Sequence, residues 1–357
     1  MTEAYLNRIE TAVPPHDVHA AFAAFARSQL ADDRRKLRIL DRMVERSGIE
    51  HRYSCLAPGL DPGNDAVDAD GLYRPGSFPT TAARMRLYEE HAPALATRAV
   101  EKLQLGDQRD RITHLVVSSC TGFSAPGLDI DIIERCGLRG SVERTMVGFM
   151  GCYAAINALK IARHIVRSEP QARVLVLSIE LCTLHLQETS DLEQILTFLL
   201  FADGCAASIV SADPTGLRLD AFNALLTPDT RQLLTWHIRE SGFDMVLSGR
   251  LPAAVQEGIG GRADEFLAGH RIPDVDAWAV HPGGRTVLDA VERAFALPPS
   301  ALAVSRNILR RFGNMSSATV MFVLAALMDQ ATAGQVGCAM AFGPGLVAET
   351  MMFRKAA

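Results

Sequence analysis

Residues 146–166 read MVGFMGCYAAINALKIARHIV and place a cysteine, Cys152, between a glycine and a run of good helix formers. An apolar strand-like segment, THLVVSS at 113–119, comes before this stretch, and a second, VLVLSIE at 174–180, follows it. Short apolar strands that alternate with apolar helices are typical of an α/β sheet covered by helices. The stretch therefore predicts a strand–helix–strand unit whose helix begins at Cys152.

The same plan recurs later in the chain. The strand-like segment DAWAVHP carries His281, Asn314 stands before the helix-like run SSATVMFVLAALM, and the strand-like segment CAMAFGPG follows. Cys120 and Cys152 are 32 positions apart, and His281 and Asn314 are 33 positions apart. Because repeats of this size are too long for a solenoid unit of roughly 20–50 residues, we expect two similar α/β halves related by a pseudo-two-fold axis. Cys152, His281 and Asn314 are then expected to converge at that axis.

The residues before this region are interpreted differently. The first 110 are expected to be mostly helical and accessory, with alanine-rich helices over 19–30 and 85–103. Proline, glycine and aspartate gather at 58–76, which predicts a surface loop there.

Composition excludes several classes of function. With 357 residues the chain can bury a substantial core, and its 36 basic and 41 acidic residues give no charge excess that would favour nucleic acid. Seven scattered cysteines without a CxxC pair argue against a disulfide framework or a zinc cluster. Charges interrupt the N-terminal segment, and no apolar run approaches the ~18 residues of a transmembrane helix. We therefore expect a cytoplasmic protein with no nucleic-acid partner and no stable membrane insertion.

Cys152 is the candidate nucleophile. Backbone N–H groups and the positive end of the helix dipole stabilise a thiolate, so we expect a lowered pKa for this thiol. The alternative is a buried structural cysteine, which is the commoner state of a free cysteine. GxSxG, HExxH and phosphate-loop motifs do not occur in the sequence, so serine hydrolase, zinc protease and kinase chemistry have no support.

His281 and Asn314 are the candidate partners of this thiol. His281 ends an apolar strand, and Asn314 precedes a helix that an asparagine would also cap well. An imidazole N–H and a carboxamide N–H can together hold an oxygen on which negative charge develops, as in an enolate left by decarboxylation. The repeated spacing favours this interpretation over an isolated structural histidine and a simple helix cap.

These residues lie in segments that resemble the motifs of the chalcone synthase-like type III polyketide synthases. The resemblance implies a homodimer of thiolase fold in an αβαβα layered arrangement, with one half over residues 1–212 and the other over 213–357. It also implies CoA thioesters as substrates, with no acyl carrier protein, bound cofactor or metal. The segments are CTGFSAPG (120–127), GFMGCYAA (148–155), FADGCAAS (201–208), HPGGRTVLDAVE (281–292), GNMSSA (313–318) and FGPG (342–345).

The resemblance also implies roles for individual residues. Cys152 is similar to the acylated nucleophile of the family, and His281 and Asn314 are similar to the pair that promotes malonyl-CoA decarboxylation. Phe201 resembles one of two gatekeeper phenylalanines, while Met245 departs from the second and suggests a more adaptable entrance. The remaining substrate-binding positions are Arg52, near the CoA phosphates, and Cys120, Thr121, Cys182, His185, Thr197, Trp236 and Ser316, on the cavity wall.

Three further segments, CTGF, ELCTLHLQ and LTWHIRESGF, are most similar to bacterial enzymes that make alkylpyrones or alkylresorcinols from fatty acyl-CoA starters. Trp236 and Met245 are expected on neighbouring strands, where a rigid indole bounds the growing chain and a thioether yields to an alkyl tail. Two alternatives stay open. A 3-oxoacyl-acyl-carrier-protein synthase III shares the fold and the three residue types but condenses once, and an inactive scaffold would have lost one of the three polar residues.

Overall fold

The computed structural model describes residues 2–59 and 66–357. Nine strands form one sheet in the order β11-β12-β13-β8-β1-β7-β6-β4-β5. The strands are β1 (Tyr5–Ala12), β4 (His114–Ser119), β5 (Glu143–Gly148), β6 (Val174–Leu181), β7 (Asp203–Ser211), β8 (Leu217–Leu226), β11 (Ala277–Val280), β12 (Val336–Gly343) and β13 (Val347–Lys355). Outside this sheet, β2 (His16–Asp17) pairs with β3 (Tyr53–Ser54), and β9 (Leu234–Arg239) pairs with β10 (Gly242–Leu247).

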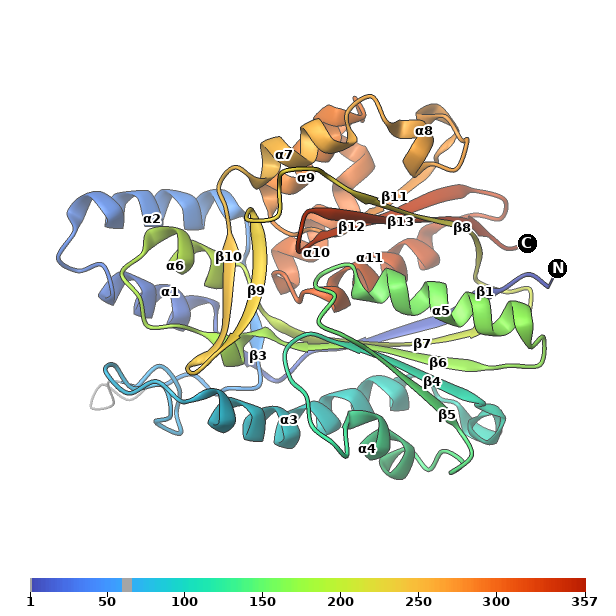
Figure 1. Ribbon diagram of the computed structural model, residues 1–357, viewed down its shortest axis with the longest axis horizontal. Helices are drawn as coiled ribbons and strands as arrows, with labels where there is room; N and C mark the ends of the chain where they lie inside the picture. The colour runs from blue at the N-terminus through green and yellow to red at the C-terminus, as the bar shows by residue number, and fades with distance from the viewer. Residues whose placement is uncertain (1, 60–65) are drawn as a thin grey trace.

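Helices cover the strands in layers, as Figure 1 shows. Helices α3 and α4 lie on one side of β4–β7, α7 and α9 lie beyond β11–β13, and α5 and α11 lie between the two groups of strands. The mixed α/β layering of the thiolase fold is thereby confirmed. The helices are α1 (His19–Ser28), α2 (Arg34–Ser47), α3 (Thr81–Lys102), α4 (Leu128–Arg135), α5 (Ala154–Ser168), α6 (Leu192–Phe198), α7 (Leu251–Ile259), α8 (Ala263–Phe266), α9 (Arg285–Ala294), α10 (Ala303–Phe312) and α11 (Ser317–Gln330).

The two central helices show why the middle layer forms. The residues from Ser317 to Leu324, the first eight of α11, are all buried, because a helix that is apolar on every face is stable only when other elements surround it. Helix α5 is alanine-rich, which allows it to approach the strands closely, and its Ala154, Ala155 and Ala158 are fully buried. Both helices begin directly after the segments that carry Cys152 and Asn314, so the two halves direct those segments to the same region.

The N-terminal strand corrects the expectation that the first 110 residues are helical accessories. Strand β1 lies in the middle of the sheet and pairs antiparallel with β7, while Tyr5 and Leu6 also pair with β8. This short β1–β8 contact joins the strands of the two halves into one sheet. The expected surface loop at 58–76 is also only partly right, because Tyr73 is fully buried and donates a hydrogen bond to the Leu184 carbonyl, at 2.7 Å. Residues 60–65 of that loop lie outside the described residues.

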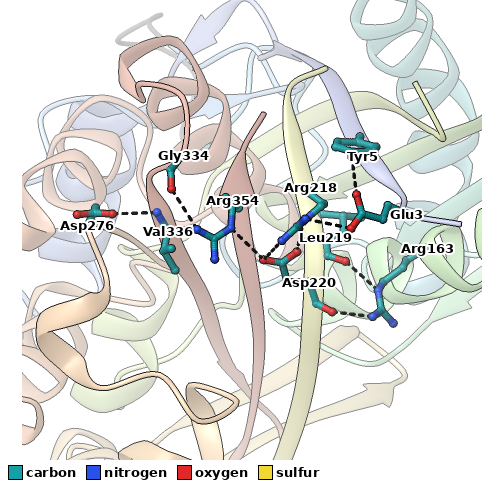
Figure 2. A network of polar contacts seen from close by, with 10 residues as sticks. All are labelled: Glu3, Tyr5, Arg163, Arg218, Leu219, Asp220, Asp276, Gly334, Val336 and Arg354. Atoms are coloured by element: carbon teal, nitrogen blue, oxygen red, sulfur yellow. Dashed lines mark hydrogen bonds and ion pairs between the residues drawn. The ribbon is translucent and has the colours of Figure 1, made fainter. Parts of the chain in front are cut away.

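A polar network reinforces the β1–β8 junction (Figure 2). Arg218 of β8 pairs with Glu3, at 3.0 Å, and with Asp220 on its own strand. From the central layer, Arg163 of α5 donates to the carbonyl of Leu219, at 2.9 Å. The network therefore ties the first residues of the chain and a central helix to the first strand of the second half.

Candidate active site

Cys152 lies two residues before α5, in a turn that requires a glycine. Gly151 has φ +84°, and a Cβ atom at this position would lie 2.2 Å from Cδ of Pro344. Pro344 belongs to the FGPG segment, so this tight loop packs directly against the turn that carries Cys152. The thiol of Cys120 accepts a hydrogen bond from the Gly151 N–H, at 3.1 Å, and fixes the turn from the other side.

The resting thiol of Cys152 is protonated. Burial raises its pKa to about 12, while a contact of 3.6 Å from the Ser316 hydroxyl to Sγ acts in the opposite direction. The expected lowering of this pKa is therefore wrong. A thiolate at a helix N-terminus gains from the dipole, but enclosure in the protein removes its hydration, and that cost is the larger effect here.

A continuous series of contacts joins the three candidate residues. Ser316, whose hydroxyl touches Cys152 Sγ, donates its backbone N–H to Oδ1 of Asn314, at 2.8 Å. Nδ2 of Asn314 donates to the carbonyl of Gly283, at 3.1 Å, and the Gly283 N–H donates to the carbonyl of His281, at 3.0 Å. The loops of the two halves thus meet where the repeated spacing predicts.

His281 has unused hydrogen-bonding capacity. Its side chain is 1 % exposed, and neither imidazole nitrogen has a hydrogen-bond partner within the described part of the chain. Burial lowers its pKa to about 3, so the ring is neutral, with one nitrogen as donor and the other as acceptor. Because a buried polar group without a partner is costly, this ring is suited to a ligand that completes its bonds.

A cavity of about 20 Å³ adjoins Cys152. Met245 and Trp236 face each other directly across the β9–β10 hairpin, as predicted, and both line the cavity. The Trp236 ring is fixed by a hydrogen bond from Nε1 to the Cys120 carbonyl, at 2.8 Å. The other predicted residues on the wall are Cys120, Thr121, Cys182, Phe201 and Ser316, and the sequence interpretation missed Phe198 and Leu234.

Three predicted substrate-binding residues lie elsewhere. His185 is fully buried behind the wall, where its ring stacks on Phe243 and meets the edge of Trp236. Thr197 lines a separate groove, and its hydroxyl donates to the carbonyl of Glu193. Arg52 is 0 % exposed and cannot meet a phosphate at the surface. Motif alignment placed these residues near the site but could not tell which cavity, if any, each side chain reaches.

The groove that Thr197 lines has a volume of about 550 Å³ and lies on the other side of the segment 198–201 from the cavity. Helix α2 contributes Met43 and Arg46, α9 contributes Arg285, and Gly283 and Gly284 also line the groove. Since the Gly283 carbonyl accepts from Asn314, the groove has one lining residue in contact with a candidate residue.

The structure also reveals a buried carboxyl that sequence reasoning missed. Glu180, the last residue of VLVLSIE, accepts hydrogen bonds from the Cys120 N–H and the Thr121 hydroxyl, each at 2.9 Å, and from the Ser317 hydroxyl. Burial raises its pKa to about 7. A single glutamate that ends an otherwise apolar strand was the available signal.

No group of three or more His, Cys, Asp or Glu side chains within residues 2–59 and 66–357 is arranged to hold a metal ion. Over the same ranges, none of the helices is both long and apolar enough to cross a membrane.

Two family models match consecutive parts of the chain. Residues 2–214 match the family model of the N-terminal domain of chalcone and stilbene synthases, and residues 219–357 match that of the C-terminal domain. The alpha-pyrone synthesis polyketide synthase-like Pks18 of Mycobacterium tuberculosis is 32% identical, over 99% of this chain and 91% of its own. Bisdemethoxycurcumin synthase of Oryza sativa is 31% identical, over 87% and 81%.

Two solved structures are similar to this chain over almost its whole length. PKS-I of the brown alga Ectocarpus siliculosus superposes with a TM-score of 0.89 at 30% identity, over 99% of both chains. The type III polyketide synthase domain of Steely1 from Dictyostelium, at 23% identity, also has a TM-score of 0.89, over 99% of this chain and 100% of that domain, and supports the fold alone.

Proposed function

This chain belongs to the chalcone and stilbene synthases, the type III polyketide synthases, and on that premise we propose that it condenses a medium- or long-chain fatty acyl-CoA starter with malonyl-CoA. Decarboxylative Claisen condensation is followed by cyclisation to an alkylpyrone or an alkylresorcinol. The observation that carries the proposal is the buried, neutral and unpartnered His281 ring, two residues before the Gly283 carbonyl that accepts from the Asn314 carboxamide. Asn314 is in turn linked through Ser316 to the Cys152 thiol.

In the first step the starter acyl group moves from CoA to Cys152. The thiol loses its proton to the acceptor nitrogen of His281, Sγ attacks the thioester carbonyl, and CoA leaves as the thiol with that proton. The second hydrogen of the Asn314 amide is free for the carbonyl oxygen, since only one bond from Nδ2, to Gly283, is formed within the described residues.

In the second step malonyl-CoA loses carbon dioxide. The electron pair of the broken C–C bond becomes an enolate, whose oxygen is held by the same two donors, His281 and Asn314. The enolate carbon then attacks the acyl-Cys152 carbonyl and expels the thiolate, which yields a chain longer by two carbons. Thioester chemistry supplies the driving force, so the proposal requires no bound cofactor.

Two observations support the proposal. The name of the Mycobacterium relative describes alpha-pyrone synthesis, which favours a pyrone as the product. The wall of the cavity contains a methionine, Met245, whose unbranched thioether adapts to the alkyl tail of a fatty acyl starter. A cavity of about 20 Å³ has room for little more than one water molecule. A long chain therefore requires the β9–β10 hairpin, with Trp236 and Met245, to move away from Cys152.

The CoA portion is proposed to bind in the groove of about 550 Å³. Arg46 and Arg285 line it, and Nη1 of Arg285 donates to the main-chain carbonyl of Arg46, at 3.1 Å, which holds the Arg285 side chain against the end of α2. Guanidinium groups bind phosphate oxygens in bidentate geometry. These two arginines replace Arg52 as the residues proposed to meet the CoA phosphates.

A homodimer is proposed through β5, which forms one edge of the large sheet. The side chain of Met146 on this strand is 41% exposed, and those of its neighbours Phe123 and Met150 are each 39% exposed. An edge strand beside exposed large apolar side chains favours pairing with a second copy. Met146→Glu is expected to reduce the mass measured by light scattering from dimer to monomer, and a monomeric wild type would contradict the proposal.

Starter use is tested with the purified protein, malonyl-CoA and a panel of acyl-CoA starters from acetyl- to palmitoyl-CoA, with products identified by mass spectrometry. We expect triketide or tetraketide pyrones or resorcinols, with the highest kcat/KM for a medium or long starter. A 3-oxoacyl-acyl-carrier-protein synthase III would make no multiketide product under these conditions. The membership in the chalcone and stilbene synthase family already favours the polyketide synthase over that alternative.

A further inference from the structure

Arg52 is a buried cation whose guanidinium forms no direct ion pair in the described part of the chain, although Asp17 and Asp203 favour its charge from a longer distance. Its side chain is 0 % exposed, and it takes part in none of the ion pairs formed by residues 2–59 and 66–357. Nη1 donates to the carbonyls of Phe198 and Phe201, at 3.1 Å each, and Nε donates to Nδ1 of His19, at 3.1 Å. Because a buried charge is costly, a guanidinium that binds main-chain carbonyls instead of a carboxylate requires an explanation.

The carbonyls that accept hydrogen bonds from Arg52 belong to the segment 198–201, which forms the wall between the cavity and the groove. The segment 198–201 leads from the last residue of α6 to β7. Phe198 and Phe201 line the cavity beside Cys152, whereas Leu199 and Leu200 line the groove. One guanidinium thus fixes both ends of the wall that separates the cavity from the groove.

This wall in turn holds the backbone of Asn314. The Asn314 N–H donates to the carbonyl of Leu200, at 2.8 Å, and the Ala202 N–H donates to the carbonyl of Asn314, at 2.9 Å. Gly313, with φ +68°, lies directly against Arg52, since a Cβ atom there would be 2.8 Å from Cγ of the arginine. Arg52 therefore touches both the wall and the residue that precedes Asn314.

We propose that Arg52 is a positioning residue for malonyl-CoA decarboxylation, whose guanidinium fixes the wall 198–201 and, through it, the Asn314 carboxamide. The inference rests on the proposed function, in which Asn314 donates to the enolate oxygen. Arginine suits this role because its planar group presents several N–H donors in a fixed geometry, whereas lysine presents one point charge on a flexible stem. The turn that carries Cys152 is fixed by other contacts, since Gly151 packs against Pro344 and donates to the Cys120 thiol, so acyl loading depends less on Arg52.

The experiment compares Arg52→Met and Arg52→Lys with Arg84→Met. Arg84 is a matched control, because it too is 0 % exposed and donates to three carbonyls, those of Pro79, Leu184 and Leu186, none of which belongs to the segment 198–201. Each variant is assayed at a temperature at which circular dichroism shows it folded. Decarboxylation is followed as acetyl-CoA formed from malonyl-CoA, and loading is followed by intact mass spectrometry after one acyl-CoA turnover.

Displacement of a catalytic group by about 1 Å can cost about 10²-fold in rate. We therefore expect Arg52→Met to lower kcat for decarboxylation by about 10²-fold, with KM for malonyl-CoA and the extent of Cys152 loading little changed. Arg52→Lys should restore part of the rate. Arg84→Met is expected to lose comparable thermal stability but to decarboxylate at a rate close to the wild-type value per folded molecule.

Equal losses of kcat in the Arg52→Met and Arg84→Met proteins, or a wild-type kcat in Arg52→Met, would overturn the positioning role. If the methionine variants do not fold, Arg52→Lys and Arg84→Lys carry the same comparison, and equal rates for these two would overturn it. A wild-type protein that releases no carbon dioxide from malonyl-CoA would instead overturn the proposed function, and this inference with it.

Discussion

Replacement of Trp236 by glycine is expected to change the products without preventing acyl loading of Cys152. The indole lines a cavity of only about 20 Å³, opposite Met245. Removal of a single leucine from a protein core can leave a cavity on the order of 150 Å³. Loss of the larger indole should therefore enlarge the space beside Cys152 several-fold. We expect additional extension steps or an altered ratio of pyrone to resorcinol.

The same substitution lowers stability by an amount that can be estimated. Truncation of a buried tryptophan costs about 3–5 kcal/mol, and Trp236 is only partly buried, so its cost should lie near the lower value. Loss of the Nε1 bond to the Cys120 carbonyl adds about 1 kcal/mol. Native proteins are stable by about 5–15 kcal/mol, so the variant should remain folded with a lower Tm.

The other tryptophan of the chain, Trp278, provides the control. It is 3 % exposed, lies on β11 and packs in the core between the strands and α9, so it does not line the cavity. Trp278→Gly should lower Tm without a change in products. The assay is mass spectrometry of products from acetyl-, hexanoyl- and palmitoyl-CoA, with loading measured on the intact protein.

Two results would contradict the reasoning. If Trp236→Gly gives the wild-type product profile from every starter, the indole does not bound the growing chain. If Trp278→Gly shifts the profile as much as Trp236→Gly does, the shift reflects lower stability and not cavity shape.

The remaining predictions concern the polar groups of the site. Cys152→Ala should abolish polyketide formation with Tm little changed, because it removes the only atom proposed to hold the growing chain, and a Cys152→Ala protein that still makes polyketide would refute this. Asn314→Ala and His281→Ala should each slow release of carbon dioxide from malonyl-CoA by about 10²–10³-fold, and loading should survive Asn314→Ala better; a wild-type rate in Asn314→Ala would make this residue only a helix cap. Because burial raises the Glu180 pKa from 4.5 to about 7, the folded state binds more protons than the unfolded state in this range, so the contribution of this group to stability falls as pH rises from about 4.5 to 7. The free energy of unfolding in urea should therefore be compared between Glu180→Gln and the wild type at two pH values. We expect the difference to be more favourable to the variant at pH 8 than at pH 5, and an equal difference at both pH values would contradict the role of the carboxyl.

The sequence by itself determined the plan of the second part of the chain. The alternation of apolar strands and helices, repeated around Cys120–Cys152 and His281–Asn314, is a local pattern, and local patterns survive folding because each element keeps its own periodicity. This repeated pattern predicted both central helices and the convergence of the loops that precede them. The short spacing between Trp236 and Met245 similarly predicted strands that pair face to face.

Only the tertiary structure decided burial, and with it the electrostatics and the size of the site. Strand β1 lies within the first 110 residues, which were predicted to be helical and accessory from their alanine-rich runs, yet it lies in the middle of the sheet, where its backbone pairs with β7 on one side and briefly with β8 on the other. The sequence motif predicted that Arg52 contacts the CoA phosphates, but its guanidinium donates hydrogen bonds to carbonyls of the segment 198–201. The pKa of Cys152 is raised, whereas the sequence predicted a lowered value, because enclosure by residues distant in sequence removes the hydration of the thiolate. The burial of a side chain depends on contacts from the whole chain, so it cannot be predicted from any single stretch of sequence.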